Sequence, residues 1–210
     1  MTLVKICGVC DADAARTAAA AGADLLGFHF CPSLRRVEPE AVRRILEGLH
    51  PRPLAVGVFI DEEPGRMEEI ADLCGLDLLQ LHGSEQPAPD GYPRPVIKAL
   101  KVHEGRLPDA SAWPDPIMLD SWSPDQRGGT GRRWDWELAR PLLAGRRVMV
   151  AGGLGPDNVG SLVRALRPYG VDVSSGVESE PRRKDPELVR AFLRAVREAD
   201  IEQAADGDER

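Results

Sequence analysis

The stretch LVKICGVCDADAARTAAAAG, residues 3–22, contains one complete strand–turn–helix unit. Its first five residues, from Leu3 to Cys7, form a short apolar run that favours a β-strand. The alanine-rich segment that follows begins at Asp11, a favourable N-cap, and ends at Gly22, which is typical of a helix C-cap. The unit therefore predicts a strand followed directly by a helix.

The same unit recurs along the chain. Apolar runs predict further strands at residues 24–30, 54–59, 76–81, 95–100, 116–119, 147–151 and 171–174. Helical patterns lie at 39–49, 63–74, 134–143, 156–166 and 185–199. The segment after the fourth strand is broken by prolines, and the helical pattern after the fifth, at 104–113, is weak.

Eight strands that alternate with helices indicate parallel strands with right-handed crossovers. Eight such units can close into a single (β/α)8 TIM barrel, here with a reduced fifth helix. An open, doubly wound sheet of about five or six strands is the alternative, and the strand count favours the barrel. The barrel is expected to occupy residues 1–199 as one domain, and the acidic segment 200–210 is expected to be a frayed tail.

The composition excludes several classes of protein. The 210 residues are 42% hydrophobic and 29% charged, which is ordinary for a globular protein. A net charge of −7 argues against a general nucleic-acid binder, and no apolar run approaches the roughly 18 residues of a membrane span. Four cysteines are too few for a disulfide framework, so a reducing cytoplasm is the expected location.

In such a barrel the chemistry lies where the strands end. Cys7 ends the first strand and Asp120 the sixth, and a thiol and a carboxyl group across one site can serve as base and acid. Lys5 shares a side of the strand with Cys7, so its charge can lower the pKa of the thiol or bind an acidic neighbour. The alternative, that Cys7 is a small core residue, stays open on position alone. Cys7 and Cys10 form a lone Cys-x-x-Cys pair, and we expect no metal there.

Glycine-rich turns predict an anion site. The turns at 151–158 and 173–177 follow the seventh and eighth strands, where barrels commonly hold a phosphate. The candidate phosphate ligands are Gly152, Gly153, Ser174, Ser175 and Gly176. Ordinary turn glycines are the alternative interpretation. The stretch Gly128-Gly129-Thr130-Gly131 predicts a loop that closes over a ligand, or else a solvated connection.

Basic and imidazole side chains complete the set of candidates. Arg35 and Arg36 follow the second strand, where a guanidinium suits a carboxylate or a phosphate. His82 ends the fourth strand and is expected to face the same site, whereas His29 is expected to pack in the structure or to lie near the surface.

These segments, in this order, resemble the phosphoribosylanthranilate isomerases of tryptophan biosynthesis. The resemblance covers residues 4–197 and rests on several short motifs. They are Lys-Ile-Cys-Gly at 5–8, Gly-Phe-His-Phe at 27–30, Gln-Leu-His-Gly at 80–83, Gly-Gly-Thr-Gly at 128–131, Gly-Gly-Leu at 152–154 and Asp-Val-Ser-Ser-Gly-Val-Glu at 172–178. The resemblance implies a cofactor-free Amadori rearrangement of N-(5-phosphoribosyl)anthranilate to 1-(2-carboxyphenylamino)-1-deoxyribulose 5-phosphate.

The resemblance also implies roles for single residues. It makes Cys7 the general base, with a lowered pKa, and Asp120 the general acid. It assigns Arg35, in a Ser-x-Arg-x-Val pattern, to the anthranilate carboxylate, with Arg36 as the alternative. Lys5, His82 and Asp172 join the substrate-binding residues.

The resemblance implies a small phosphorylated molecule as the partner, with no nucleic acid or membrane, and a monomer or a homodimer. The sequence departs from the family pattern at Arg132-Arg133-Trp134, where Lys-Thr-Phe is usual. Three alternatives remain: a phosphosugar isomerase of histidine biosynthesis, which has an aspartate in place of Cys7, the same chemistry in a specialised pathway, and a non-catalytic barrel that binds a phosphorylated metabolite.

Overall fold

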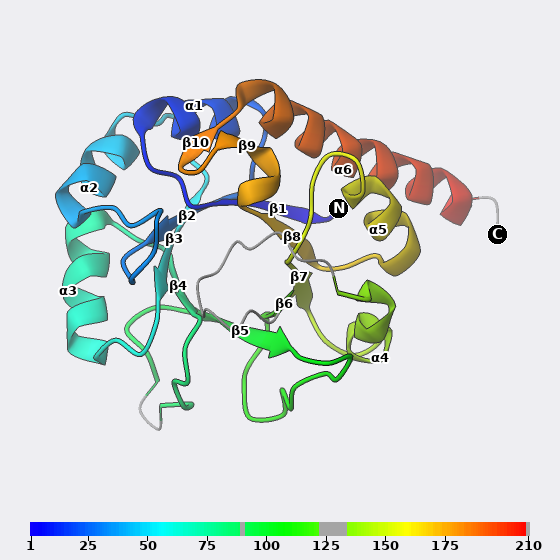
Figure 1. Cartoon of the computed structure of the whole chain (residues 1–210), viewed down its shortest axis with the longest axis horizontal. Helices are drawn as coiled ribbons and strands as arrows, with labels where there is room; N and C mark the ends of the chain where they lie inside the picture. The colour runs from blue at the N-terminus through cyan, green and yellow to red at the C-terminus, as the bar shows by residue number, and fades with distance from the viewer. Residues whose placement is uncertain (89–90, 122–133, 209–210) are drawn as a thin grey trace.

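The chain folds into a closed barrel of eight parallel strands, which pair in chain order until β8 meets β1 (Figure 1). The computed structural model describes residues 1–88, 91–121 and 134–208. The strands are β1 (Leu3–Cys7), β2 (Leu25–His29), β3 (Leu54–Phe59), β4 (Leu78–Leu81), β5 (Val96–Val102), β6 (Ile117–Ser121), β7 (Val148–Val150) and β8 (Gly170–Val173). The predicted (β/α)8 barrel is confirmed, and the open sheet is excluded.

Helices cover most of the outside of the barrel. They are α1 (Ala12–Ala20), α2 (Pro39–Glu47), α3 (Pro64–Cys74), α4 (Arg140–Leu143), α5 (Val159–Leu166) and α6 (Pro186–Asp208), with a 3₁₀ turn, η1 (Trp136–Ala139), before α4. Helix α1 begins where the sequence predicts, because the Asp11 side chain accepts a hydrogen bond from the backbone N–H of Ala14 at 2.8 Å. Helix α3 ends at Gly75, whose φ of 69° is left-handed.

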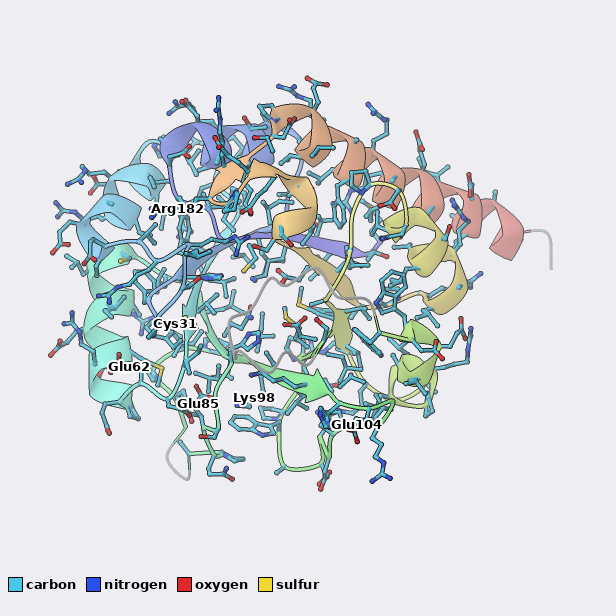
Figure 2. The ribbon with its side chains drawn as sticks, viewed as in Figure 1. Cys31, Glu62, Glu85, Lys98, Glu104 and Arg182 are labelled. Atoms are coloured by element: carbon cyan, nitrogen blue, oxygen red, sulfur yellow. The ribbon has the colours of Figure 1, made fainter. Side chains whose placement is uncertain are left out.

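The outer ring is open beside β5, where loops replace helices within the described residues (Figure 1). The weak helix expected at 104–113 is absent, and the segment forms turns instead. Lys98 points outward from β5 and is 4% exposed. Its Nζ lies 2.6 Å from Glu85 Oε2 and 5.1 Å from the centre of the Trp113 ring. Figure 2 labels Lys98 and Glu85, which lie next to each other. Two loops and a buried ion pair therefore cover the strand that lacks a helix.

The C-terminal segment differs from the expected frayed tail. Helix α6 continues to Asp208, well past the predicted end at residue 199. Asp200 accepts hydrogen bonds from the backbone N–H and the hydroxyl of Thr2 at 2.9 and 2.8 Å. Arg164 and Glu202 form an ion pair at 3.0 Å between α5 and α6. These polar contacts hold α6 against the barrel at residues 200 and 202, and an apolar pattern in the sequence does not reveal them.

Side chains inside the barrel form two layers. The lower layer is apolar, and Leu25, Val56, Ile97, Met118 and Met149 pack there in one cluster. The upper layer, nearer the carboxyl ends of the strands, is polar, and its buried members include Lys5, His29, Gln80, Asp120 and Asp172. The apolar layer is thus the floor of a polar opening, which we call the mouth. Among the described residues, no helix has the length and apolar character needed to cross a membrane.

Candidate active site

Two adjoining cavities open at the mouth. The first is lined by Gly152, Gly153, Ser175 and Gly176 from the loops after β7 and β8. The second is lined by Cys7, His29, Val58, Gln80 and His82 from β1 to β4, among others. Asp120, Asp172 and Ser174 border both cavities, so the two form one continuous site.

Cys7 and Asp120 border the same space from opposite sides of the barrel. Cys7 is 4% exposed and Asp120 is 9% exposed, so both are largely removed from water. Gly8, which follows Cys7, has a φ of +71°, and a Cβ there would lie 2.3 Å from Cδ of Arg35. Only glycine fits this turn, which explains the residue after the cysteine.

The Cys7 thiol has a raised pKa, which corrects the lowered value expected for a base. Burial is the largest cause, and the charge of Asp172 adds to it, whereas Lys5 acts in the opposite direction. Lys5 itself is fully buried, with its Nζ 2.8 Å from Asp172 Oδ1. Burial alone would lower the pKa of Lys5, but the charges of Asp172 and Cys7 outweigh it and raise the pKa. Lys5 is therefore a permanent cation whose charge is shared between the carboxylate and the sulfur.

His29 is a site residue that the sequence analysis missed. It is buried, and its Nε2 lies 3.3 Å from Cys7 Sγ, whereas its Nδ1 lies 2.9 Å from the hydroxyl of Ser33. Burial lowers the pKa of His29 well below its usual range, and the charge of Lys5 adds to this effect. The alternation of side chains along β2 is a signal that could have found it, because residues 27 and 29 share the inner face.

Asp120 accepts two hydrogen bonds from Ser121 in the mouth. Its Oδ1 accepts the backbone N–H at 2.7 Å and the hydroxyl at 3.4 Å, and its Oδ2 lies 3.3 Å from His82 Nε2. On the far side of the ring, His82 Nδ1 lies 3.2 Å from the side-chain nitrogen of Gln80. The structure thus places His82 in the mouth, in contact with the candidate acid.

The loop after β7 lies close to the loop after β8 and to the end of β6. A Cβ at Gly176, after β8, would lie 1.9 Å from the carbonyl oxygen of Leu154. A Cβ at Gly152 would lie 2.8 Å from the backbone nitrogen of Ser121, the last residue of β6. Asn158 holds the first loop by accepting the N–H of Gly155 at 3.0 Å. Within the described residues, the buried hydroxyl of Ser174 has no hydrogen-bond partner. Backbone N–H groups and an unpartnered hydroxyl suit an anion with several oxygens.

Arg35 lies beside the mouth but borders neither cavity. Its Nε and one terminal nitrogen bind both oxygens of Glu178 at 2.8 and 2.6 Å, and the other terminal nitrogen makes no hydrogen bond in the described part of the chain. Lys184 joins them at 2.9 Å from Glu178. Arg36 lies outside the mouth, with its side chain 57% exposed.

The remaining candidates concern the loop over the site and metal binding. The stretch Gly128-Gly129-Thr130-Gly131 lies outside the described residues, as do Arg132 and Arg133. Among the described residues, no group of three His, Cys, Asp or Glu side chains is arranged to hold a metal ion.

A thiol and a carboxyl group that share a cavity with a glycine- and serine-lined end suit a barrel enzyme that acts on small phosphorylated molecules. The chain belongs to the N-(5'-phosphoribosyl)anthranilate isomerase family, whose model matches residues 4–195. The family suggested by the sequence motifs is thereby confirmed.

Similar proteins cover nearly the whole chain. The isomerase of Desulforudis audaxviator is 49% identical over 206 residues, which are 95% of this chain and all of that one. The crystal structure of the enzyme from Thermus thermophilus is 39% identical, with a TM-score of 0.84, and the match covers 94% of this chain and 99% of that one. A phosphoribosylanthranilate isomerase in complex with reduced 1-(o-carboxyphenylamino)-1-deoxyribulose 5-phosphate is 34% identical, with a TM-score of 0.79 and coverage of 94% and 100%.

Proposed function

We propose that this isomerase of tryptophan biosynthesis carries out its Amadori rearrangement with Cys7 as the base and Asp120 as the acid. The observation that carries the proposal is the continuous site: both groups border one cavity, and that cavity runs on into the glycine- and serine-lined end. A substrate held by its phosphate at this end would present its sugar carbons between the thiol and the carboxyl group.

The phosphate takes no part in the bond changes and serves as a handle. Backbone N–H groups around Gly153 and Ser175, together with the unpartnered Ser174 hydroxyl, would bind it. Its binding energy orients the reacting carbons, which lowers the entropic cost of the chemical step. The anthranilate ring would lie in the second cavity, whose lining includes the less polar side chains of Cys31, Pro32, Val58 and Ile60.

The reaction begins when Asp120 donates its proton to the ribose ring oxygen. The ring opens at the anomeric carbon, and the nitrogen lone pair forms an iminium. That cation makes the proton on the neighbouring carbon acidic, so that the Cys7 thiolate can remove it. The C–H electron pair becomes the double bond of an enolamine, which tautomerises to the ketone.

Arg35 is proposed to bind the anthranilate carboxylate through the terminal nitrogen that Glu178 leaves available. Glu178 and Lys184 would fix the guanidinium in place, so that little entropy is lost on binding. The protein itself is proposed to be a monomer or a homodimer and to act in a reducing cytoplasm.

The test is turnover by Cys7→Ala and Asp120→Asn, followed by the loss of substrate fluorescence. Each variant is expected to lose about a hundredfold to ten-thousandfold in kcat, because general acid–base groups contribute that much. Cys10→Ala is the matched control, since Cys10 lies three residues from Cys7 and borders neither cavity, and it is expected to keep its rate. Near-normal rates in a folded Cys7→Ala or Asp120→Asn variant would contradict the proposal.

A further inference from the structure

The closest polar contact of the Cys7 sulfur on β2 is an imidazole. Cys7 on β1 pairs in register with Gly27 on β2, and a Cβ at Gly27 would lie 2.8 Å from the sulfur. The missing side chain at this position makes room for Sγ beside the strand. Two residues further along the same inner face, His29 brings its Nε2 to 3.3 Å from the sulfur. The strand pairing therefore builds a Cys–His contact directly into the mouth.

The contact with Ser33 bears on which ring nitrogen of His29 carries the hydrogen. The Ser33 hydroxyl oxygen accepts the backbone N–H of Arg35 at 3.0 Å, and its own hydrogen is available to donate. His29 Nδ1 lies 2.9 Å from that oxygen and is the acceptor of this hydrogen in the arrangement that the inference uses. A neutral imidazole that accepts at Nδ1 carries its hydrogen on Nε2. That N–H is then directed at the sulfur of Cys7.

We propose that His29 is the positioning residue of Cys7, and that its Nε2–H donates to the sulfur and stabilises the thiolate form. The thiol proton leaves to water through the open mouth, and the sulfur keeps the electron pair of the S–H bond. The inference rests on the proposed function, in which the Cys7 thiolate removes a proton from the substrate.

The thiolate gains from such a donor because the balance of its surroundings does not favour it. Burial and the Asp172 carboxylate raise the pKa of Cys7, and Lys5, whose charge and hydrogen bond act in the opposite direction, is shared with that same carboxylate. A hydrogen bond donated to a charged group contributes more than one between neutral groups. A neutral His29 supplies it without placing a second cation beside Lys5.

The charged and titratable groups around the pair come from several elements. Those that act on Cys7 or His29 are Lys5 on β1, Cys31 and Arg35 after β2, His82 after β4, Asp172 on β8 and Lys184 on the short strand β10 (Arg183–Lys184). A substitution of His29 leaves all of them in the chain. A change in the ionisation of Cys7 in such a variant therefore reports on the imidazole itself.

The experiment compares His29→Leu with His29→Gln in the full-length protein. Gln retains an N–H donor near the Nε2 position, whereas Leu has none. The rate at which iodoacetamide alkylates Cys7 is measured against pH by peptide mass spectrometry, beside the pH profile of kcat. In His29→Leu both midpoints are expected to move up by about one pH unit, so that thiolate and kcat near pH 7 fall about tenfold. His29→Gln is expected to restore most of the shift, and alkylation of Cys10 serves as the internal control.

Ser33→Ala keeps the test decisive if His29→Leu does not fold. It removes the group that directs the His29 hydrogen to Nε2, so the Cys7 midpoint is expected to move in the same direction by a smaller amount. If His29→Leu folds and the midpoint of Cys7 alkylation is unchanged, the inference is overturned, even if turnover falls. If His29→Leu does not fold, an unchanged midpoint in Ser33→Ala overturns it instead. If Cys7→Ala keeps its turnover, Cys7 is not the base and the proposed function is wrong. The pH profile of Cys7 alkylation in the His29 variants then still tests the contact between Cys7 and His29.

Discussion

The Nε2 atom of His82 lies 3.3 Å from Oδ2 of Asp120, while its Nδ1 lies 3.2 Å from the amide nitrogen of Gln80. A ring that accepts a hydrogen bond from the amide at Nδ1 carries its own hydrogen on Nε2, on the side of the carboxyl group. In the proposed reaction, the attraction between this N–H and Asp120 strengthens as Asp120 gives up its proton and becomes a carboxylate. His82 is therefore expected to favour the state that forms during ring opening over the protonated acid.

His82→Leu is expected to lower kcat by about 10- to 100-fold, which corresponds to the loss of roughly 1–3 kcal/mol of interaction between the Nε2–H and the charge that forms on Asp120. Gln80→Leu is expected to change kcat in the same direction by a smaller factor, because it removes only the group that orients the ring. Steady-state kinetics with thermal unfolding as a folding check measures both. A folded His82→Leu variant with an unchanged kcat would show that the contact has no part in acid catalysis.

Ser174→Ala is expected to weaken substrate binding without destabilising the fold. The buried hydroxyl of Ser174 has no partner within the described chain, so its removal costs no hydrogen bond in the protein. The loss of one contact to the phosphate should raise KM about fivefold, from roughly 1 kcal/mol. Ser111→Ala, at an exposed position, is the control and should leave KM unchanged. A KM that stays constant in Ser174→Ala would remove this hydroxyl from the phosphate site.

The sequence predicts the barrel well because its signals are local. Each strand is a short apolar run, and turn glycines and caps such as Asp11 mark the helices that follow. The segments around Lys98 are harder to predict, because a buried lysine held by Glu85 and Trp113 replaces an apolar helix contact. That arrangement joins residues from three separate segments, and no single stretch of sequence indicates it.

The candidate site is predictable as a set of strand ends, but the contacts between its side chains are not. The rule that chemistry lies at strand ends selects Cys7, Asp120 and His82, and the structure places all three at one cavity. The same rule also applies to His29 when it is combined with the alternation of inward and outward side chains along β2. A histidine flanked by two phenylalanines is nevertheless easily interpreted as part of the packed core. The pairing of Arg35 with Glu178 spans 143 positions of sequence, so only the fold reveals it.

Gly176→Ala is expected to destabilise the protein and to weaken phosphate binding. The new Cβ would lie 1.9 Å from the carbonyl oxygen of Leu154, so the loops after β7 and β8 must separate. Overpacking of this kind typically costs about 1–3 kcal/mol. Gly65→Ala is the matched control, because nothing lies within 4 Å of a Cβ there and alanine favours the helix. Urea unfolding and inhibition by inorganic phosphate measure the two effects, and equal stability of both variants would contradict the close approach.

The lowered pKa of Glu178 predicts how the stability of the fold depends on pH. Burial alone would raise its pKa, but the hydrogen bonds and charges of Arg35 and Lys184 outweigh burial and hold the pKa below its usual range. The folded protein therefore binds fewer protons than the unfolded chain near the ordinary glutamate pKa of about 4.3. The stabilisation is fully present above that pH and is lost as the pH falls through the folded-state value. Urea midpoints between pH 3 and 7 should fall less steeply toward acid in Glu178→Gln, which should also be less stable at pH 7. Parallel profiles for the two proteins would contradict this role.

Lys5→Met tests the ion pair at the centre of the mouth. The substitution leaves the Asp172 carboxylate buried without its partner, and breaking such a pair costs roughly 3–5 kcal/mol. Arg66→Ala is the control, because the Arg66–Glu69 pair on α3 is exposed and solvent screens it, so that it contributes little to stability. The Lys5→Met/Asp172→Leu double variant should recover part of the loss, since it removes the unpaired charge as well as the pair. If Lys5→Met is no less stable to urea than Arg66→Ala, then the Lys5 ammonium serves the sulfur of Cys7 alone and the carboxylate finds its compensation elsewhere in the mouth.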